Sequence, residues 1–548
     1  MMEIPIHVVG LAPAIAIIMA FVLPLVSLII KNRRVWEIYA IVGTGIVLIL
    51  TALTFCKAFF ESDKPLVYVF GGWPPHIGIV YEVDKVNALL GLLTATIMFL
   101  ISVYSVKYLE EHHGIEWYYT LLLGVEAGML GCFYTGDVFN LFVMLEVTSV
   151  AAYGLVAFFR SQREAIEAAL KYALVGSVAT TIYFIALAFI YGAFGTLNMA
   201  FLAYITRAGW TLGPIEPFIR PVPGMTLDAA LSAAIIALAL STWAFTVKAA
   251  LFPNHFWLPD AHPAAPTPIS ALLSGLVVKV GVYAVLRFTY TLFGLPIGRS
   301  GEFTPITFET NLLLLKILLI LGTLAAIVAS LLMVVQRDIK RLIAYSTILH
   351  IGYIFMGMGL YTYLGVAASI FHTINHAIAK ALLFLTAGVF IHTLKTRDID
   401  ELAGIGVKMP VSTFCFLVAV LSLIGIPGFN GFASKWLLYT AIIEAGLVPL
   451  VVVIVFTSAM AALAYIKIIY AIWLKPPVRD ISKVKEASPL MTIPLVILAL
   501  ACILIGILPS MFMDKVIFPA TTSLYDVYSY VEVGVKKFIS IIFSPAGG

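Results

Sequence analysis

The chain is poor in charged residues. Only 11% of its 548 residues are Asp, Glu, Lys or Arg, against roughly 25% in soluble domains, and 62% are hydrophobic. The formal net charge of +4 is too small to indicate a nucleic-acid partner. The composition therefore argues against a soluble enzyme and predicts a polytopic protein whose surface contacts the lipid bilayer.

Cysteine is also scarce, and the sequence motifs of cofactor sites are absent. Cys56, Cys132, Cys415 and Cys502 lie far apart in apolar segments and form no C-x-x-C pair for zinc, haem or an iron–sulfur cluster. Neither a G-x-G-x-x-G nor a G-x-x-x-x-G-K-[ST] nor a G-x-S-x-G sequence occurs. We therefore predict no cofactor, no metal and no catalytic residue, and we do not expect the chain to be an enzyme by itself.

What the chain has is a series of apolar runs. Runs of about 20 apolar residues are long enough to cross a bilayer, and we predict fourteen of them, near residues 9–30, 36–58, 87–107, 116–135, 138–159, 165–194, 228–252, 265–293, 311–335, 341–360, 363–393, 409–446, 449–473 and 488–511. One alternating set of loops holds sixteen Lys and Arg, and the other holds six when the C-terminal tail is left out. The positive-inside rule makes the first set cytoplasmic, which predicts that both ends of the bundle face outside.

Two of these spans are interrupted by proline. The seventh carries Lys248 just before Pro253, and the twelfth carries Pro427 just before Lys435. A unit of five helices crosses the membrane an odd number of times, so a second copy five spans later runs with the opposite topology. Interrupted helices at matching positions of such a pair mark transport sites. We predict an inverted repeat of spans 4–8 and 9–13; the alternative is that the prolines only kink their helices.

The spans divide the all-α chain into four predicted parts. These are an N-terminal three-helix segment with an outer hairpin (1–115), a first five-helix repeat (116–293), a second repeat (311–473), and a last span with an amphipathic tail (488–548). The hairpin is expected near residues 64–83, where β-branched and aromatic residues flank a Gly/Pro centre. The charges of the tail favour a helix at the membrane interface over a further span.

Ionisable side chains recur inside the spans. Burying each one costs about 2.5–3.5 kcal/mol on insertion scales, so we do not expect so many ionisable residues to be present for packing alone. They predict a polar axis through the middle of the bundle, formed by Glu126, Asp137, Glu146, Lys171, Lys248, His255, Lys279, Lys316, His350, His372, His376, Lys380 and Lys435.

Glu146 and Lys248 are the predicted ion pair of this axis. Opposite charges about 4 Å apart gain roughly 4 kcal/mol at an effective dielectric near 20. Closing the pair holds a proton on the lysine, and opening it releases that proton to the next base. Lysine suits this role because a desolvated lysine loses its proton readily, whereas arginine stays charged. The alternative is a static ion pair that joins spans 5 and 7.

His372, His376 and Lys380 follow one another at intervals of four, so they share one helix face. Two such histidines can ligate a metal, but the lysine and the lack of a nearby carboxylate oppose a divalent cation. We favour a proton relay over a metal site. His350 fits either a hydrogen-bonded core residue or a relay member, and the basic loop at 337–341 is expected only to anchor the topology.

Four motifs together resemble one known family. Residues 136–146, 248–270, 338–346 and 371–384 are similar to the antiporter-like subunits of the complex I superfamily. That family includes the D-type member of Mrp Na⁺/H⁺ antiporters, membrane-bound hydrogenase subunits, and the L, M and N members of NADH-quinone oxidoreductase. The similarity covers roughly residues 65–480. Lys279, which follows Pro-Thr-Pro-Ile-Ser, and the fourteen-span length favour the Mrp D branch and its hydrogenase relatives.

The resemblance implies roles for individual residues. It makes Glu146 the modulating glutamate of span 5 and Lys248 its partner on the broken helix, and Lys279 becomes the lysine that links two half-channels. The proton path then consists of Glu146, Lys248, Lys279, His372, His376, Lys380 and Lys435, with Asp137, Lys171, His255 and His350 as secondary candidates. Glu126, His255 and Lys316 match no functional position of the family and rank lower.

The resemblance also implies a function and partners. It predicts a proton-translocating antiporter-like subunit in the cytoplasmic membrane of a prokaryote, assembled with other membrane subunits. Protons and Na⁺ are the expected ions, and a sodium gradient or a redox or hydrogenase module is the expected driving force. Two alternatives stay open: a self-sufficient secondary carrier for a small solute, and a non-conducting scaffold.

Overall fold

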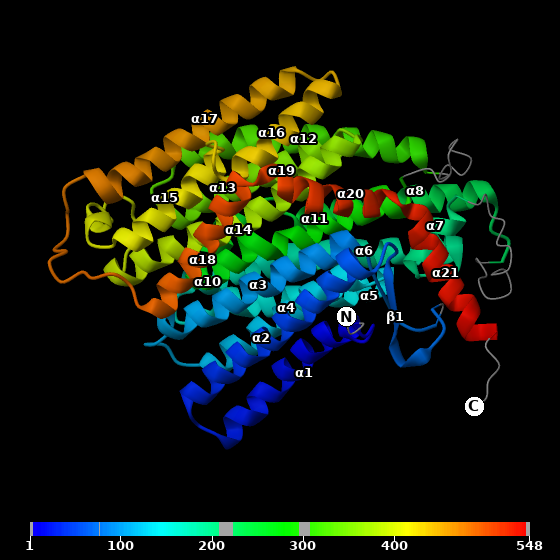
Figure 1. The fold of residues 1–548 in the computed structure, drawn as a ribbon, viewed down its shortest axis with the longest axis horizontal. Helices are drawn as coiled ribbons and strands as arrows, with labels where there is room; N and C mark the ends of the chain where they lie inside the picture. Colours follow the sequence, from blue (N-terminus) through cyan, green and yellow to red (C-terminus); the bar gives the residue numbers. More distant parts are fainter. Residues whose placement is uncertain (1–3, 76, 208–222, 295–306, 544–548) are drawn as a thin grey trace.

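The computed structural model describes residues 4–75, 77–207, 223–294 and 307–543 as a bundle of long helices lying side by side (Figure 1). Within this part, twelve helices are long and apolar enough to cross a membrane. They are α1 (Val8–Ile29), α2 (Arg33–Cys56), α3 (Lys85–Tyr108), α5 (Val138–Val156), α6 (Arg163–Phe194), α8 (Leu227–Lys248), the continuous helix α10–η5–α11–η6 (Thr267–Leu292), α12 (Phe308–Val335), α13 (Ile339–Gly359), α14 (Tyr363–Leu394), α17 (Pro449–Ile469) and α18 (Pro489–Ile507).

Two predicted spans are not among the twelve. One is α4 (Ile115–Tyr134), a helix of 20 residues that carries Glu116 and Glu126. The other is the broken twelfth span, which consists of α15 (Pro410–Ile424) and α16 (Asn430–Glu444), 15 residues each. The predicted class, a helical polytopic membrane protein, is confirmed, while the number fourteen and the inverted repeat stay predictions.

A small hairpin marks one end of the bundle. Strands β1 (Leu66–Val69) and β2 (Val80–Val83) pair antiparallel, with Leu66 opposite Val83, as the sequence predicted. The α4–α5 connection joins them there, because the Gly136 N–H donates to the Val80 carbonyl at 2.8 Å. We call this the hairpin end. Arg220 and Arg299, two of the basic residues that the charge count assigned to this side, lie outside the described residues.

The opposite end collects the loops that are rich in Lys and Arg, and we call it the basic end. The Ile339 N–H donates to the Arg397 carbonyl at 3.0 Å, which joins the α12–α13 loop to the loop after α14. Lys340 reaches the loop between α9 (Leu258–Ala264) and α10 (Thr267–Leu272), where its Nζ donates to the Ala265 carbonyl at 2.5 Å. Alternate loops therefore meet at the same end, as the predicted topology requires.

Both predicted interruptions are present. The first helix, α8, ends at Lys248, and the chain turns through residues 250–257 before α9 begins. The second, α15, ends at Ile424, where Gly425 takes a φ of +92° and its N–H caps the helix on the Leu421 carbonyl at 3.1 Å. Glycine adopts this left-handed conformation without steric cost.

The C-terminal segments cross the bundle toward the hairpin. In Figure 1 the red helices α19 (Pro509–Phe512), α20 (Phe518–Tyr525) and α21 (Val527–Phe543) run to the blue hairpin, where α21 contacts α7 (Met199–Ile205) and β1. The predicted tail helix is thus present. The most buried spans are the α10–α11 helix, α13 and α14, and these central helices carry most of the candidate lysines and histidines.

Candidate functional site

Lys248 lies at the end of α8, beside the first break, and is buried. Its Nζ donates to the Ser149 Oγ at 2.8 Å and lies 3.4 Å from the Tyr153 hydroxyl, both on α5. Among the residues that the structure describes, no ion pair within 4.0 Å joins Lys248 to Glu146, and the Glu146 Oε1 is buried without a hydrogen-bond partner. This corrects the predicted direct pair: the hydroxyl groups of Ser149, one turn farther along α5, and of Tyr153, two turns farther, take the amine instead.

Lys279 lies at the centre of the bundle on α11 (Val278–Leu286), directly after the π-helical turn η5 (Leu273–Val277). A π turn interrupts the regular bonding of an α-helix and is frequent at functional sites. Here the Ser274 carbonyl accepts a hydrogen bond from the Lys279 Nζ at 2.7 Å. The same Nζ lies 2.5 Å from the His376 Nδ1 on α14. The buried lysine is therefore bonded both to its own helix and to the next member of the axis.

Three histidines continue the contact that begins at Lys279. The rings of His376 and His350 lie 5.2 Å apart between centroids. The His350 Nδ1 and the His372 Nε2 share a hydrogen bond of 3.0 Å, and the His372 Nδ1 bonds to the Ser434 Oγ at 2.9 Å. The series therefore passes from α14 to α13, back to α14 and on to α16.

Lys435, the residue after Ser434, lies at the far end of this series. Its Nζ donates across the second break to the Ile424 carbonyl at 2.8 Å and to the Ser458 Oγ of α17 at 2.9 Å. The amine also lies 5.2 Å from the centroid of the Tyr353 ring. Lys435 is thus held between the broken helix and α17, with hydroxyl groups around it.

Lys380 forms a side branch, one turn from His376. Its Nζ donates to the Ser346 Oγ and, at 3.2 Å, to the Ile343 carbonyl, and it lies 3.5 Å from the Tyr465 hydroxyl. These partners belong to α13 and α17. The branch points away from the histidine series, toward the basic end.

The helices that carry the two halves of the path, α8 with Lys248 and α11 with Lys279, are in close main-chain contact. A Cβ added at Gly281 would lie 2.5 Å from the Ala249 N and 2.6 Å from the Phe245 carbonyl oxygen. Glycine therefore lets α11 pack directly against the end of α8. This contact places Lys248 and Lys279 on adjoining helix segments, although no hydrogen bond joins their side chains in the described part of the chain.

The secondary candidates are placed differently. Asp137 caps α5, and its carboxylate accepts the Asn140 N–H at 2.7 Å. His255 lies in the turn before α9, stacked on Phe252. Of these candidates His350 alone lies among the histidines of the series, and its two predicted roles, a hydrogen-bonded core residue or a relay member, both stay predictions.

Lys171 is not buried with the residues of the axis, which corrects its predicted place among them. Its side chain is 48% exposed and forms ion pairs with Glu167 at 2.6 Å and Asp260 at 3.1 Å. Helix α6 has 32 residues, about 48 Å at 1.5 Å per residue, whereas the hydrocarbon core is about 30 Å thick. A helix of this length can extend beyond the core at the basic end or cross it at a tilt.

Sequence reasoning missed several buried polar residues. Lys340, expected only to anchor the topology, is 2% exposed and bonded to the loop before α10. His262 is buried against Phe384. Asp84 and Arg287 form an ion pair at 2.7 Å in which both side chains are 1% exposed. Because Arg287 lies within an apolar span of the sequence, its position alone could have indicated a buried and paired charge.

The geometry suits proton transfer better than ligand binding. Each histidine can take a proton at one ring nitrogen and release one at the other, and each lysine can hold a proton at its amine. Across the described ranges, no group of three or more His, Cys, Asp or Glu is arranged to hold a metal ion. These residues therefore form a row of proton donors and acceptors across four helices, in which hydrogen bonds join Lys279 to His376 and His350 to His372, while the His376 and His350 rings lie near each other without a bond.

Comparison with known proteins adds independent evidence. The family model described as NADH:quinone oxidoreductase/Mrp antiporter, transmembrane, matches residues 135–461. The N subunit of the NADH-quinone oxidoreductase of Desulforudis audaxviator is 32% identical over 471 residues, covering 83% of this chain and 87% of that protein. The D subunit of the Na⁺/H⁺ antiporter of Alkalihalophilus pseudofirmus is 31% identical over 410 residues, covering 75% of each.

A solved structure agrees with these relatives. A chain of the membrane-bound sulfane sulfur reductase, an archaeal respiratory membrane complex, is 31% identical, with a TM-score of 0.84 over 96% of this chain and 99% of that one. The oxidoreductase relative and the antiporter relative are nearly equal in identity, so the preference for the Mrp D branch stays a prediction. The family match itself confirms what the four motifs predicted: the chain belongs to the transmembrane NADH:quinone oxidoreductase/Mrp antiporter family.

Proposed function

We propose that this chain is a proton-translocating, antiporter-like membrane subunit of a multisubunit complex. The observation that carries the proposal is the buried series from Lys279 through His376, His350 and His372 to Lys435. Each of these five residues is at most 3% exposed. Burying such groups costs free energy in a membrane, and a row of them lying close to one another is what lateral proton transfer requires.

Lys248 and Glu146 form the proposed control point of the first half. In this structure Ser149 and Tyr153 hold the amine, and Glu146 keeps a buried oxygen unbonded. A shift that brings the carboxylate to about 4 Å would stabilise the charged lysine by roughly 4 kcal/mol at an effective dielectric near 20. Moving between these partners would take up and release a proton beside the first break.

The assembly supplies the coupling in this proposal. Relatives carry the names of a Na⁺/H⁺ antiporter and of a NADH-quinone oxidoreductase, so a sodium gradient and a redox module are both candidate drivers. Any oxidation would take place in partner subunits, and this chain would not be an enzyme by itself. By the positive-inside rule, the basic end would face the cytoplasm and both ends of the chain the outside of a prokaryotic cell.

The test is proton flux in proteoliposomes that contain the natively purified complex, followed with a pH-sensitive dye. Lys279→Ala is expected to abolish flux in a complex of unchanged subunit composition. Lys316→Ala is the matched control, because Lys316 also lies within a membrane helix but on the exposed face of α12; its flux should equal that of the wild type. Wild-type flux from an intact Lys279→Ala complex would overturn the proposal. Solute transport by the purified chain alone would favour a self-sufficient carrier instead.

A further inference from the structure

The hydrogen bonds of the histidine series determine which ring nitrogen of each histidine carries its hydrogen. A neutral imidazole has one N–H donor and one acceptor nitrogen, and the bond that one nitrogen makes fixes the state of the other. His350, His372, His376 and Ser434 are each at most 2% exposed. Neighbouring protein groups, and not bulk water, therefore direct the hydrogens of these side chains.

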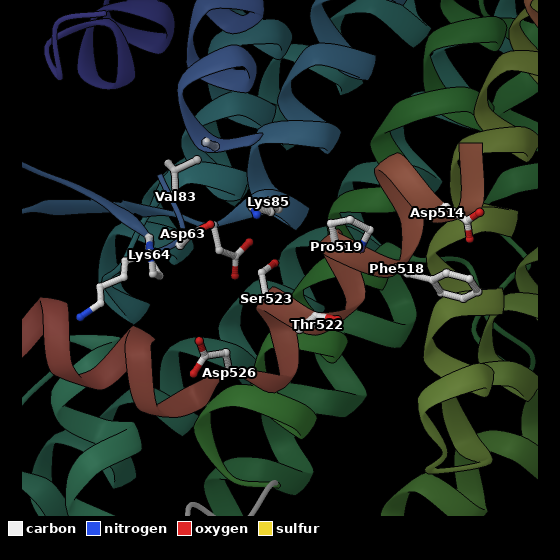
Figure 2. Close-up of a pocket in the computed structure, with 13 residues that line it drawn as sticks. Asp63, Lys64, Val83, Lys85, Asp514, Phe518, Pro519, Thr522, Ser523 and Asp526 are labelled. Carbon is white, nitrogen blue, oxygen red and sulfur yellow. The ribbon is translucent and has the colours of Figure 1, made fainter. Parts of the chain in front are cut away.

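The surface pocket at the hairpin end does not open onto this series. Figure 2 shows Lys85 and Asp63 facing Ser523 across the pocket, which lies between the hairpin connections and α20. Of the described residues that line it, none belongs to the series from Lys279 to Lys435. Water in this pocket therefore does not contact the imidazoles.

Ser434 fixes the hydrogen of His372. Its hydroxyl donates to the Gly431 carbonyl, three residues earlier on α16, at 3.2 Å. A hydroxyl has one hydrogen, and a carbonyl oxygen can only accept. The Ser434 oxygen must therefore accept in its 2.9 Å bond with the His372 Nδ1. This places the hydrogen of His372 on Nδ1 and leaves its Nε2 as an acceptor.

His372 in turn fixes the hydrogen of His350. Because the His372 Nε2 accepts, the 3.0 Å bond between the two rings needs a hydrogen on the His350 Nδ1. A neutral His350 then has a bare Nε2. This atom is buried without a hydrogen-bond partner among the described residues, so it is a free acceptor.

At the other end of the series, Lys279 fixes the hydrogen of His376. The Lys279 amine donates to the Ser274 carbonyl at 2.7 Å and lies 2.5 Å from the His376 Nδ1. A protonated amine has only hydrogens to offer, so this Nδ1 accepts. A second positive charge beside the buried ammonium would be unfavourable, so His376 is neutral at rest and carries its hydrogen on Nε2.

The unbonded nitrogens of His376 and His350 are complementary. The Nε2 of His376 offers a hydrogen and the Nε2 of His350 offers a lone pair, on rings whose centroids lie 5.2 Å apart. A buried donor and a buried acceptor that stay unbonded each cost free energy. A small ring rotation or one intervening water that joined them would therefore be favourable, and every hydrogen from Lys279 to Ser434 would then point toward the second break.

The second break holds the Ser434 end of the series in place. A Cβ added at Gly431 would lie 1.8 Å from the Ser422 carbonyl oxygen, so the first turn of α16 packs directly on the end of α15. The Asn430 carbonyl, in the same turn, accepts a hydrogen bond from the Asn375 Nδ2 of α14 at 2.8 Å. The direction of the Ser434 hydrogen therefore depends on how the broken helix packs against α14.

We propose that Ser434 is a positioning residue of this series, which keeps the hydrogen of His372 and, through it, that of His350 on Nδ1. The bare His350 Nε2 can then take the proton of the His376 Nε2. The Lys279 ammonium replaces that proton at the His376 Nδ1, so the positive charge moves from Lys279 to His350. This inference rests on the proposed function, because it needs Lys279 as a proton carrier.

Removing the hydroxyl should reverse the tautomers. In Ser434→Ala the Nδ1–H of His372 loses its acceptor, so its hydrogen is better placed on Nε2, where it can donate to the His350 Nδ1. His350 then carries its own hydrogen on Nε2. Two hydrogens would meet between His350 and His376, and the proton of His376 would have no acceptor.

The test measures tautomers and proton flux on the same natively purified complex. In NMR of the complex labelled with ¹³C,¹⁵N-histidine, ring nitrogens with and without a hydrogen give separate signals. Signals missing in His350→Phe and His372→Phe assign these two residues, and both should carry Nδ1–H in the wild type. Ser434→Ala should shift both toward Nε2–H and lower flux in proteoliposomes about tenfold, the effect of losing one such hydrogen bond. Ser434→Thr, which keeps a hydroxyl, should restore both.

Ser330→Ala is the matched control. Ser330 is also 0% exposed, and its hydroxyl also donates to the carbonyl three residues earlier, that of Ile327, at 2.8 Å. It lies on α12, and in the described part of the chain its hydroxyl bonds to no histidine. Flux and histidine signals should therefore equal those of the wild type. An equal loss of flux in Ser330→Ala and Ser434→Ala would overturn the positioning role.

The outcomes separate this inference from the function on which it rests. With flux lost in Lys279→Ala, any of three results would overturn only the role of Ser434: an Nε2–H tautomer of His350 in the wild type, unchanged histidine signals in Ser434→Ala, or wild-type flux in Ser434→Ala. Wild-type flux in an intact Lys279→Ala complex would overturn the proposed function itself.

Discussion

His350 of α13 and His372 of α14 share a hydrogen bond of 3.0 Å between Nδ1 and Nε2. His372 and His376, which share one face of α14, lie 6.4 Å apart between ring centroids. His350 stands 5.2 Å from each of these rings. The connection between the two histidines of α14 therefore runs through the neighbouring helix.

Replacing His350 by phenylalanine tests this connection. His350→Phe keeps an aromatic ring of similar size but removes both nitrogens, so proton flux in proteoliposomes should fall about 100-fold or more while the complex stays intact. His392→Phe is the control, because His392 lies in the last turn of α14 at the basic end. Equal flux in the two variants would show that protons do not pass through His350.

Lys248 can be tested without removing its charge. Lys248→Arg keeps a cation beside Ser149 but one that does not lose its proton under physiological conditions. We expect an assembled complex whose proton flux is lower by about 100-fold or more. Lys316→Arg, on the exposed face of α12, should transport normally. Normal flux in Lys248→Arg would mean that the residue contributes only a fixed charge.

Gly281 controls how closely the two halves approach. In Gly281→Ala the new Cβ meets main-chain atoms at 2.5 and 2.6 Å, and such overpacking typically costs about 1–3 kcal/mol. The thermal stability of the purified complex should fall, and so should flux, because α11 is pushed away from Lys248. Gly124→Ala is the control, since its nearest contact is the Ala151 Cβ at 3.6 Å. Equal stability of the two variants would contradict the tight contact.

The buried ion pair between Asp84 and Arg287 should be costly to break. Arg287→Met leaves Asp84 buried without its partner, and removing one member of such a pair costs about 3–5 kcal/mol. Arg287→Met combined with Asp84→Leu should regain most of the lost thermal stability, because no unpaired charge remains. Lys64→Ala breaks an exposed pair with Glu532 and should change the melting temperature little. A double variant no more stable than Arg287→Met would show that the hydrogen bonds of Asp84 matter more than the charge.

Much of the fold could be predicted because it depends on local properties. The length of an apolar run decides whether it can cross the bilayer, and Pro253 and Pro427 marked both interruptions. β-Branched and aromatic residues around a Gly/Pro centre predicted a hairpin near residues 64–83, and the structure has it at 66–83. The spacing of His372, His376 and Lys380 placed them on one face, because a helix repeats every 3.6 residues.

The sequence predictions were wrong about the surroundings of Lys171 and about the hydrogen-bond partner of Lys248. The sequence suggests that Lys171 lies within the membrane because apolar residues surround it. In a helix of 32 residues, however, the sequence does not show where the hydrocarbon core begins. Lys248 was assigned to Glu146, but the packing of α8 on α5 decides which side chain of that helix its amine meets, and it meets Ser149.

The sequence by itself determined most of the spans, the two breaks, the family and many of the ionisable residues that the structure buries. Only the tertiary structure decided that His350 links two turns of α14 and that Arg287 pairs with Asp84, 203 residues earlier in the chain. The physical reason is that helical periodicity sets the face of a residue relative to its own axis. Which neighbouring helix that face meets depends on how the whole bundle packs.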